Sequence, residues 1–370
     1  MTSEKSRKKE KDRKNLDPAA ARFQKRFHFP LGVEKGRFFT MLPTWLFKRS
    51  HTYNKMRIYS NRNEKGEYSV SFGMAFAGGG TRGAAHVGVL MALEEHGLKP
   101  DAVSGASAGG IVAGLYAAGF TAKELHEVVQ ELSRKGKLLI DPAYGDLLLA
   151  LGQFISRKPL SLSGFLKGNR LERYLDTLTE GKKLCQLSMR TVIPAVDLIS
   201  GLVISYTNSL FGVRPMRGVA WENEATLSEA MRASAAVPAV FRPKMIGKRH
   251  LVDGGVVDIL PVDLLMAAGE ENVLAVDISG SYQCPEHIDI LEVASHSLGI
   301  LQDNLRECKT RGERLLLKPA LPEDAGLLTF SQMEACIEAG YEAAIRMLPT
   351  IRALFSLQTG GWERETKMAL

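Results

Sequence analysis

The chain of 370 residues is long enough for one large α/β domain with a tail, or for two average domains. Its 45% hydrophobic and 24% charged residues exclude a collagen-like or wholly disordered chain. The net charge of +7 is unevenly placed, because residues 1–60 carry 16 Lys and Arg against 5 Asp and Glu, whereas the remainder carries 32 against 36. The basic charge therefore belongs to an N-terminal arm, and we expect no nucleic-acid partner for the main body.

The cysteines are scattered and form no CxxC pair, which favours a reducing compartment and gives no zinc spacing. No apolar run approaches the roughly 20 residues that span a bilayer, and no apolar segment of a secretory signal follows the basic start. We therefore expect a cytoplasmic protein without a transmembrane helix. Residues 1–60 are expected either to contact an anionic membrane peripherally or only to add solubility, with the aromatic segment 37–49 packed on the main domain. The oligomeric state is left open.

Strand and helix patterns alternate from residue 69 onwards. A strand over 69–77 precedes a glycine loop and a helix over 84–95, and a strand over 102–105 precedes a Gly-rich turn and a helix over 109–118. This order predicts a βαβ unit and a parallel sheet. The elements expected after it are helix 122–133, helix 169–179, strands 190–197 and 202–207 joined by a hairpin, helix 227–233, strand 250–252, helix 261–268, strand 272–278, helix 287–307, strand 315–319 and helix 331–348.

The least regular stretch is 134–168, where apolar pieces alternate with Pro and Gly, and it is predicted to form a cap or lid. We expect three parts in the chain: a partly disordered basic arm over 1–66, a catalytic domain over 67–350 and a C-terminal tail over 351–370.

The first motif is GGGTRG at residues 78–83, between a predicted strand and a predicted helix. Its spacing fits the G-x-G-x-x-G fingerprint of dinucleotide-binding folds, which needs an acidic residue at the end of the next strand. Here that strand ends at Gly105 before Ser107, and Asp101 lies at its other end, so no nicotinamide or flavin is expected. The glycines instead leave consecutive N–H groups to face a phosphate or a transient oxyanion at a helix N-terminus, or they form a simple tight turn.

The second motif is GASAG at residues 105–109, which fits G-x-S-x-G at a strand-to-helix turn. Gly105 and Gly109 lack the side chains that would clash in a sharp turn, so Ser107 is pushed outward above the N-terminus of the next helix. The helix dipole favours negative charge that forms near this hydroxyl. Ser107 is therefore a candidate nucleophile, and the alternative is an ordinary serine in a Gly-rich turn.

The third motif is DGG, in which Asp253 ends a short strand and two glycines turn the backbone. This arrangement can aim a carboxylate into a site, although Asp-Gly is also a common turn dipeptide. A serine nucleophile needs a base, and no histidine after Ser107 has the Gly-flanked loop setting of a catalytic base; these are His126, His250, His287 and His296. A carboxylate is a poor base in water, but burial would raise the pKa of Asp253 and make it a better proton acceptor for the serine hydroxyl.

In this order, each after a predicted strand, the three motifs resemble the patatin-like phospholipase family. The matching lines are AFAGGGTRGAAHVGVLMALEEHGLKPDAVSGASAGGIVAGLYAAG and ASAAVPAVFRP with LVDGGVVDILPVD, within about residues 70–280, and the likeness is looser over 281–350. The resemblance implies a three-layer α/β/α fold with a mostly parallel central sheet. It also implies a catalytic dyad of Ser107 and Asp253 without histidine, and no metal or cofactor.

Carried over by motif, the oxyanion hole would consist of Gly78, Gly79, Gly80, Arg82 and Gly83, and the nucleophile elbow of Gly105 and Gly109. The expected activity is hydrolysis of fatty-acyl esters of lipids through an acyl-enzyme on Ser107, of the phospholipase A, lysophospholipase or esterase type. The headgroup, acyl position and chain length are left open. Two alternatives stay beside it: a lipid-binding protein of the same fold without catalysis, and an α/β-hydrolase esterase with a histidine base.

Overall fold

A computed structural model describes residues 71–144, 156, 163–279, 290–308 and 312–355. The basic arm, the C-terminal tail beyond 355 and much of the expected lid lie outside the described residues, so the predictions made for them are not tested here. Within the described residues no helix is both long and apolar enough to span a membrane.

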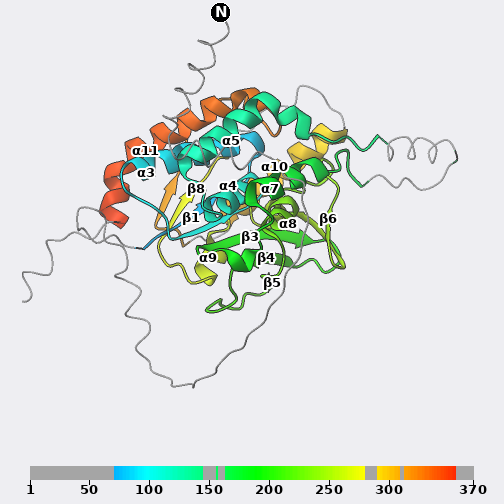
Figure 1. Cartoon of the computed structure of the whole chain (residues 1–370), viewed down its shortest axis with the longest axis horizontal. Coiled ribbons are helices and arrows are strands. Elements are labelled where there is room, and N and C mark those ends of the chain that lie inside the picture. Colours follow the sequence, from blue (N-terminus) through cyan, green and yellow to red (C-terminus); the bar gives the residue numbers. More distant parts are fainter. Residues whose placement is uncertain (1–70, 145–155, 157–162, 280–289, 309–311, 356–370) are drawn as a thin grey trace, which may run out of the picture. The chain divides into compact units, whose positions relative to one another are not determined.

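A mixed, mostly parallel sheet forms the middle layer (Figure 1). Its strands lie in the order β5-β4-β3-β2-β1-β8-β9, and every neighbouring pair is parallel except β3 with β4. The bounds are β1 Gly73–Phe76, β2 Ala102–Gly105, β3 Arg190–Asp197, β4 Val203–Thr207, β5 Val219–Glu222, β8 Val273–Val276 and β9 Leu315–Leu317. The buried, apolar residues of β1 and β8 suit central strands that are covered on both faces. The predicted α/β fold with a mostly parallel central sheet is confirmed.

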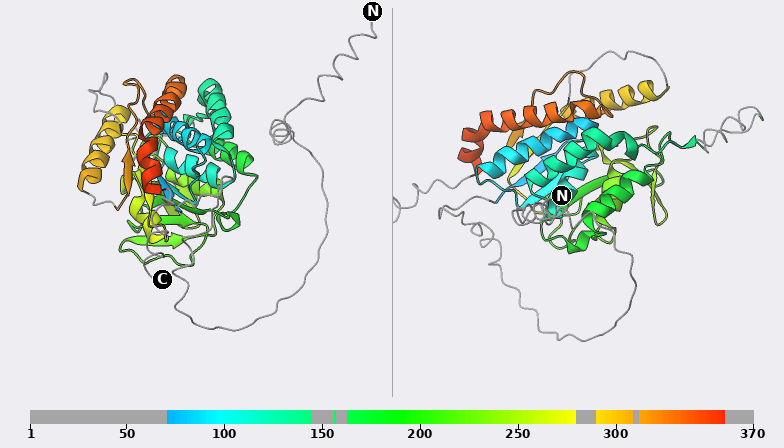
Figure 2. Two further views of the ribbon diagram at one scale, coloured as in Figure 1. Left: turned by 90° about the vertical axis from the view of Figure 1, so that its left-hand side faces the viewer. Right: turned by 45° about the horizontal axis from the view of Figure 1, so that its top comes forward.

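Helices cover both faces of the sheet (Figures 1 and 2). The long helices α3, α5 and α11 lie side by side on one face, and the short α9 lies on the other. The bounds are α3 Ala84–Glu95, α4 Ala108–Ala117, α5 Ala122–Lys135, α7 Asn169–Thr179, α8 Leu227–Ser234, α9 Val262–Ala267, α10 Ile290–Cys308 and α11 Met333–Phe355. The expected helix and strand positions therefore hold to within a few residues for most of the chain.

Strand β3 is the element that brings distant parts of the site together. Its first residues pair with β2 in parallel, and its last three pair antiparallel with β7 (Arg249–Asp253). Because β4 occupies the other edge of β3, strands β2 and β7 share one edge and run toward each other. The residues that follow β2 and those that end β7 therefore meet beside the middle of β3.

Three details differ from the sequence predictions. Strand β5 and strand β6 (Lys244–Ile246), which pairs with β7, were not predicted, because both are short and only partly buried. Helix α11 continues through Pro349 to Phe355, beyond the predicted end at 348. Ile351 and Phe355 are fully buried, and the Phe355 ring packs against Phe72 with centroids 5.0 Å apart. Burial of this last turn offsets the backbone hydrogen bond that proline removes.

Candidate active site

Ser107 lies at the sharp turn between β2 and α4, with 6% of its surface exposed. Its backbone has φ 53° and ψ −122°, a strained conformation for a residue with a side chain. The turn closes because its neighbours are glycines: a Cβ on Gly105 would clash with the carbonyl of Gly109, and a Cβ on Gly109 with the carbonyl of Phe76. The structure thus places Ser107 at the N-terminus of α4, where the helix dipole favours negative charge.

Asp253 ends β7 directly beside Ser107. The Gly255 N–H donates to Asp253 Oδ1 at 2.7 Å, and the Ser107 hydroxyl lies near enough to the same carboxylate to affect its pKa. Burial raises the pKa of Asp253 to about 6, although both of these neighbours act in the opposite direction. A carboxylate with this pKa is ionised at neutral pH and has a higher proton affinity than a carboxylate in water, which suits a general base.

The loop at residues 78–83 lies against the same turn, since a Cβ on Gly78 would stand 3.1 Å from Ser107 Cβ. The Gly78 N–H donates to the Ile259 carbonyl at 2.9 Å, and the Thr81 N–H to the Leu327 carbonyl at 3.2 Å. Within the described part of the chain, no such backbone partner is found for the N–H groups of Gly79 and Gly80. These two donors are therefore the ones left to face a ligand.

Arg82 fixes the orientation of this loop. Its Nε donates to the Gly79 carbonyl at 3.3 Å, and burial lowers the pKa of its guanidinium. In a trans peptide the N–H points opposite to the carbonyl, so the Gly80 N–H points away from Arg82. Gly83, at the end of the loop, packs closely on α4, where an added Cβ would stand 2.7 Å from Ala108 Cβ.

An apolar cavity of about 170 Å³ opens beside Ser107. Its walls come from α3, α4, α5, α7, the segment after α8 and the turn before α11. Ser107 and Thr81 are the polar side chains among the lining residues, and the apolar ones include Val87, Ile111, Val128, Leu132, Leu171 and Phe241. The cavity can therefore take a hydrocarbon chain whose polar end lies at Ser107.

A second cavity, of about 630 Å³, lies beyond the glycine loop, and polar and apolar groups share its lining. Gly79 and Arg82 line it, whereas Gly80 lines the apolar cavity. Arg306 on its wall pairs with Asp277 at 3.3 Å and with Asp303 at 2.9 Å. The loop thus separates an apolar space from a charged one.

The described histidines that were considered as bases lie at the surface or along the second cavity. His126 bonds to Glu334 at 3.0 Å near the surface, His250 is exposed at the start of β7, and His296 lines the second cavity. His287 lies outside the described residues. Sequence reasoning did not single out His86, whose Nε2 lies 2.8 Å from the Ala77 carbonyl; burial lowers its pKa to about 4 and keeps it neutral.

Two further residues touch the site and were also not singled out. The Ser234 hydroxyl accepts a hydrogen bond from the Ser107 N–H at 3.0 Å, and the Ala236 carbonyl accepts one from the Asp253 N–H at 3.0 Å. Both belong to the ASAAVP line, whose roles no spacing rule reveals. No group of three metal-ligating side chains occurs in the described part of the chain.

A family model described as patatin-like phospholipase matches residues 74–266, a range that contains the glycine loop, Ser107 and Asp253. The uncharacterized protein YqhO of Bacillus subtilis is 31% identical over 216 residues, which are 55% of this chain and 70% of that one. An uncharacterized NTE family protein of Mycobacterium tuberculosis is 27% identical over 221 residues, covering 60% of this chain and 52% of its own.

A lysophospholipase NTE1 of Debaryomyces hansenii is 25% identical over 240 residues, covering 63% of this chain and 14% of its own. The chain thus spans about half of the mycobacterial relative and a small part of the yeast one. Among solved structures, VipD from Legionella pneumophila aligns with a TM-score of 0.41 and 16% identity, over 84% of this chain and 72% of that one.

Proposed function

Because the chain belongs to the patatin-like phospholipase family, we propose that it hydrolyses fatty-acyl esters of lipids, with Ser107 as nucleophile and Asp253 as base. One observation carries the proposal: the Ser107 hydroxyl lies beside a buried carboxylate whose pKa is raised to about 6, at the edge of an apolar cavity. A nucleophile, a base matched to neutral pH and a space for the acyl chain therefore meet at one point.

In the first step, Asp253 accepts the proton of Ser107 as the hydroxyl oxygen attacks the ester carbonyl. The C–O bond to the alcohol then breaks, the proton passes from Asp253 to the leaving alkoxide, and an acyl-enzyme remains on Ser107. In the second step, Asp253 takes a proton from water, which attacks the acyl carbon. The fatty acid leaves and Ser107 regains its proton. The closeness of the two side chains supports this order of steps without a histidine.

The charge on the tetrahedral intermediate needs hydrogen-bond donors beside Ser107. The N–H groups of Gly79 and Gly80 fit this role, and the Arg82 bond to the Gly79 carbonyl holds the peptide that carries the Gly80 N–H. Gly78 shapes the loop instead, because its N–H already bonds to Ile259. Gly83 contributes close packing on α4.

The apolar cavity is the proposed site of the acyl chain. Its lining is almost wholly hydrocarbon, so a fatty-acyl chain gains from leaving water there, at about 0.8 kcal/mol for each buried CH₂ group. Glycerophospholipids, lysophospholipids and acylglycerols all present such a chain on an ester carbonyl, and all three remain candidate substrates.

The test is fatty-acid release from vesicles of a diacyl phospholipid, from lysophospholipid micelles and from a monoacylglycerol emulsion. We expect release from at least one of them, and a loss of about 10³-fold or more in Ser107→Ala. Ser205→Ala is the matched control, since Ser205 is fully buried on β4. Equal rates in wild type and Ser107→Ala, or no release by folded wild type from any of the three lipids, would overturn the proposal.

A further inference from the structure

The end of helix α8 holds the backbones of both proposed catalytic residues. Ser234, the last residue of α8, is fully buried, and its Oγ accepts the Ser107 N–H at 3.0 Å. Two residues later, the Ala236 carbonyl accepts the Asp253 N–H at 3.0 Å. Ser107 and Asp253 lie 146 positions apart in the sequence, yet one short segment contacts both.

The Ser107 backbone needs such support because its φ of 53° is costly for a residue with a side chain. A strained turn persists only where its surroundings hold it, and the Ser107 N–H is a buried donor that must have an acceptor. The Ser234 hydroxyl is confined, since a Cβ on Gly110 of α4 would stand only 3.2 Å from its Oγ. The hydroxyl therefore holds the turn from a fixed position.

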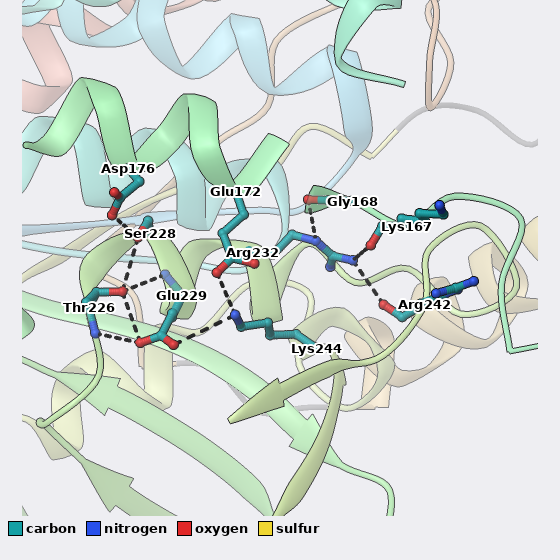
Figure 3. Close-up of polar contacts among 10 residues, drawn as sticks. All are labelled: Lys167, Gly168, Glu172, Asp176, Thr226, Ser228, Glu229, Arg232, Arg242 and Lys244. Carbon is teal, nitrogen blue, oxygen red and sulfur yellow. Dashed lines mark hydrogen bonds and ion pairs between the residues drawn. The ribbon is translucent and has the colours of Figure 1, made fainter. Parts of the chain in front are cut away.

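Helix α8 is itself anchored at its beginning (Figure 3). Thr226 and Glu229 form a capping box, in which each side chain bonds to the other residue's backbone N–H. The Ser228 hydroxyl donates to Asp176 of α7 at 2.8 Å. Lys244 of β6 contacts Glu229 at 3.7 Å. The first turn of α8 is thus tied to a neighbouring helix and strand.

Arg232 anchors the other end, two residues before Ser234 (Figure 3). Its Nε donates to the Gly168 carbonyl at 3.1 Å, and one terminal nitrogen donates to the carbonyls of Lys167 and Arg242 at 2.9 and 3.0 Å. The guanidinium also lies over the Phe241 ring, 5.0 Å from its centroid. Three carbonyls and one ring therefore fix the C-terminal turn that presents Ser234.

The same segment also contributes residues to the wall of the apolar cavity. Ala235 and Val237 line it, whereas Ser234 and Ala236 hold the dyad. The segment at residues 234–237 is thus shared by the cavity and by the reacting groups.

On these contacts, and resting on the proposed function, we propose that Ser234 is a positioning residue for the reaction. Through its bond to the Ser107 N–H, it holds the nucleophile in reach of Asp253, while the Ala236 carbonyl holds Asp253 from the same segment. Loss of the Ser234 acceptor lets the strained turn relax and moves Ser107 Oγ away from the carboxylate. The step affected is the attack by Ser107, and not lipid binding.

The test compares Ser234→Ala with Ser228→Ala. Both serines are buried hydroxyls on the same helix with one described hydrogen bond to a neighbouring element, but only Ser234 contacts the dyad. We expect Ser234→Ala to lower kcat about 10- to 100-fold with KM within about 3-fold, and to slow fluorophosphonate labelling of Ser107 by a similar factor. Ser228→Ala is expected to lower Tm and to keep kcat within about 3-fold of wild type.

Two conservative variants separate positioning from packing. Ser234→Thr keeps the hydroxyl acceptor and is expected to retain most of kcat. Ser234→Cys keeps nearly the same volume but offers a weak acceptor, so its kcat is expected to fall as in Ser234→Ala. Thermal unfolding of each variant shows whether it is folded, and the Cys variant replaces the Ala variant if the latter does not fold.

Unchanged kcat in Ser234→Ala and Ser234→Cys, alongside a wild type that depends on Ser107, would overturn the inference and leave the proposed function standing. A wild type no more active than Ser107→Ala would instead overturn the proposed function and the inference with it. A loss of kcat shared equally by Ser228→Ala would also overturn the inference, because it would show a general effect of disturbing α8.

Discussion

Strands β3 and β7 pair antiparallel, and each end of this short ladder carries a buried aspartate. At one end, Asp197 accepts the Ser200 hydroxyl at 2.7 Å and the N–H groups of Ile199, Ser200 and His250 at 3.2–3.3 Å. Burial alone would raise the pKa of Asp197, but these hydrogen bonds outweigh it and lower the pKa below its ordinary value. Asp197 is thus a structural anion that fixes the β3–β4 hairpin.

At the other end, Asp253 accepts the Gly255 N–H and lies beside the Ser107 hydroxyl, and burial raises its pKa to about 6. The two carboxylates lie on one strand pair, but Asp253 is enclosed by protein on all sides, whereas Asp197 lies close to the surface. The depth of burial and the number of donors therefore both contribute to the opposite pKa shifts. A carboxylate that is short of donors keeps a high affinity for a proton at neutral pH. The fold therefore raises the proton affinity of Asp253 by burying its carboxylate deeply and giving it few hydrogen-bond donors, at some expense of stability.

The largest expected difference between variants of the two aspartates is in enzymatic activity. Asp253→Asn removes the proton acceptor for Ser107, and we expect kcat/KM for lipid hydrolysis to fall about 10³-fold or more. Asp197→Asn leaves the dyad intact, and its activity is expected to stay within about 10-fold. Initial rates on the best lipid substrate measure both. Comparable losses in the two variants would show a general effect of replacing an aspartate on this strand pair, and would contradict a specific role of Asp253.

The pH dependence of activity should follow the raised pKa of Asp253. The base must be ionised, so kcat/KM is expected to be constant above about pH 7 and to fall about tenfold per unit below about pH 6. A soluble short-chain ester is the appropriate substrate, because its binding does not depend on a charged lipid surface. A profile that stays flat down to pH 4.5 would contradict a base with this pKa.

Stability is expected to change with opposite signs in the two variants. The raised pKa means that Asp253 favours folding fully below its unfolded pKa near 4, and that this contribution is lost as pH rises through about 6. At pH 8, the free energy of unfolding of Asp253→Asn should therefore exceed that of wild type by about 1–3 kcal/mol. The difference should vanish near pH 4.

The opposite applies to Asp197, whose lowered pKa gives stability above its unfolded pKa that is lost on acidification. Asp197→Asn should be less stable than wild type at pH 8, with a difference that shrinks as the pH falls. Urea unfolding at pH 8 and pH 4.5 measures both variants. Destabilisation by Asp253→Asn at pH 8 would contradict the explanation given for its pKa.

The smallest expected effect concerns the strained backbone of the partner, Ser107. Both Ser107→Ala and Ser107→Gly remove the hydroxyl, but only glycine adopts φ 53° without a side-chain clash. We expect Ser107→Gly to be more stable than Ser107→Ala by about 1 kcal/mol. Equal Tm values for the two variants would show that the turn holds little strain.

Much of the fold follows from local patterns. Helix α7 begins and ends as predicted, because an amphipathic repeat runs between glycine-containing turns. Strands β5 and β6 could not be predicted from local patterns, since neither contains four buried residues in a row. The continuation of α11 through Pro349 could not be predicted from local patterns either, because burial of Phe355 against Phe72 depends on tertiary packing.

The candidate active site likewise has parts that local sequence patterns predict and parts that they do not. Glycines flank the turn at Ser107 and follow Asp253 at the end of its strand. They indicate sharp turns in the sequence, because a side chain at these positions would clash. The support from Ser234 and Ala236 depends on how β7 and α8 pack, and no local spacing reveals it. Nor does the motif show that the Gly78 N–H is already engaged by Ile259, which narrows the oxyanion donors proposed here to Gly79 and Gly80.

The central claim is that Asp253 activates Ser107, and fluorophosphonate labelling followed by peptide mapping tests it most directly. Wild type, Ser107→Ala, Asp253→Asn and Asp197→Asn would be compared at pH 8, with and without lipid vesicles. We predict a label on Ser107 in wild type and in Asp197→Asn, no label at that position in Ser107→Ala, and a labelling rate at least about 10²-fold lower in Asp253→Asn. Labelling of Ser107 at the wild-type rate in Asp253→Asn, or no labelling of folded wild type under either condition, would contradict the claim.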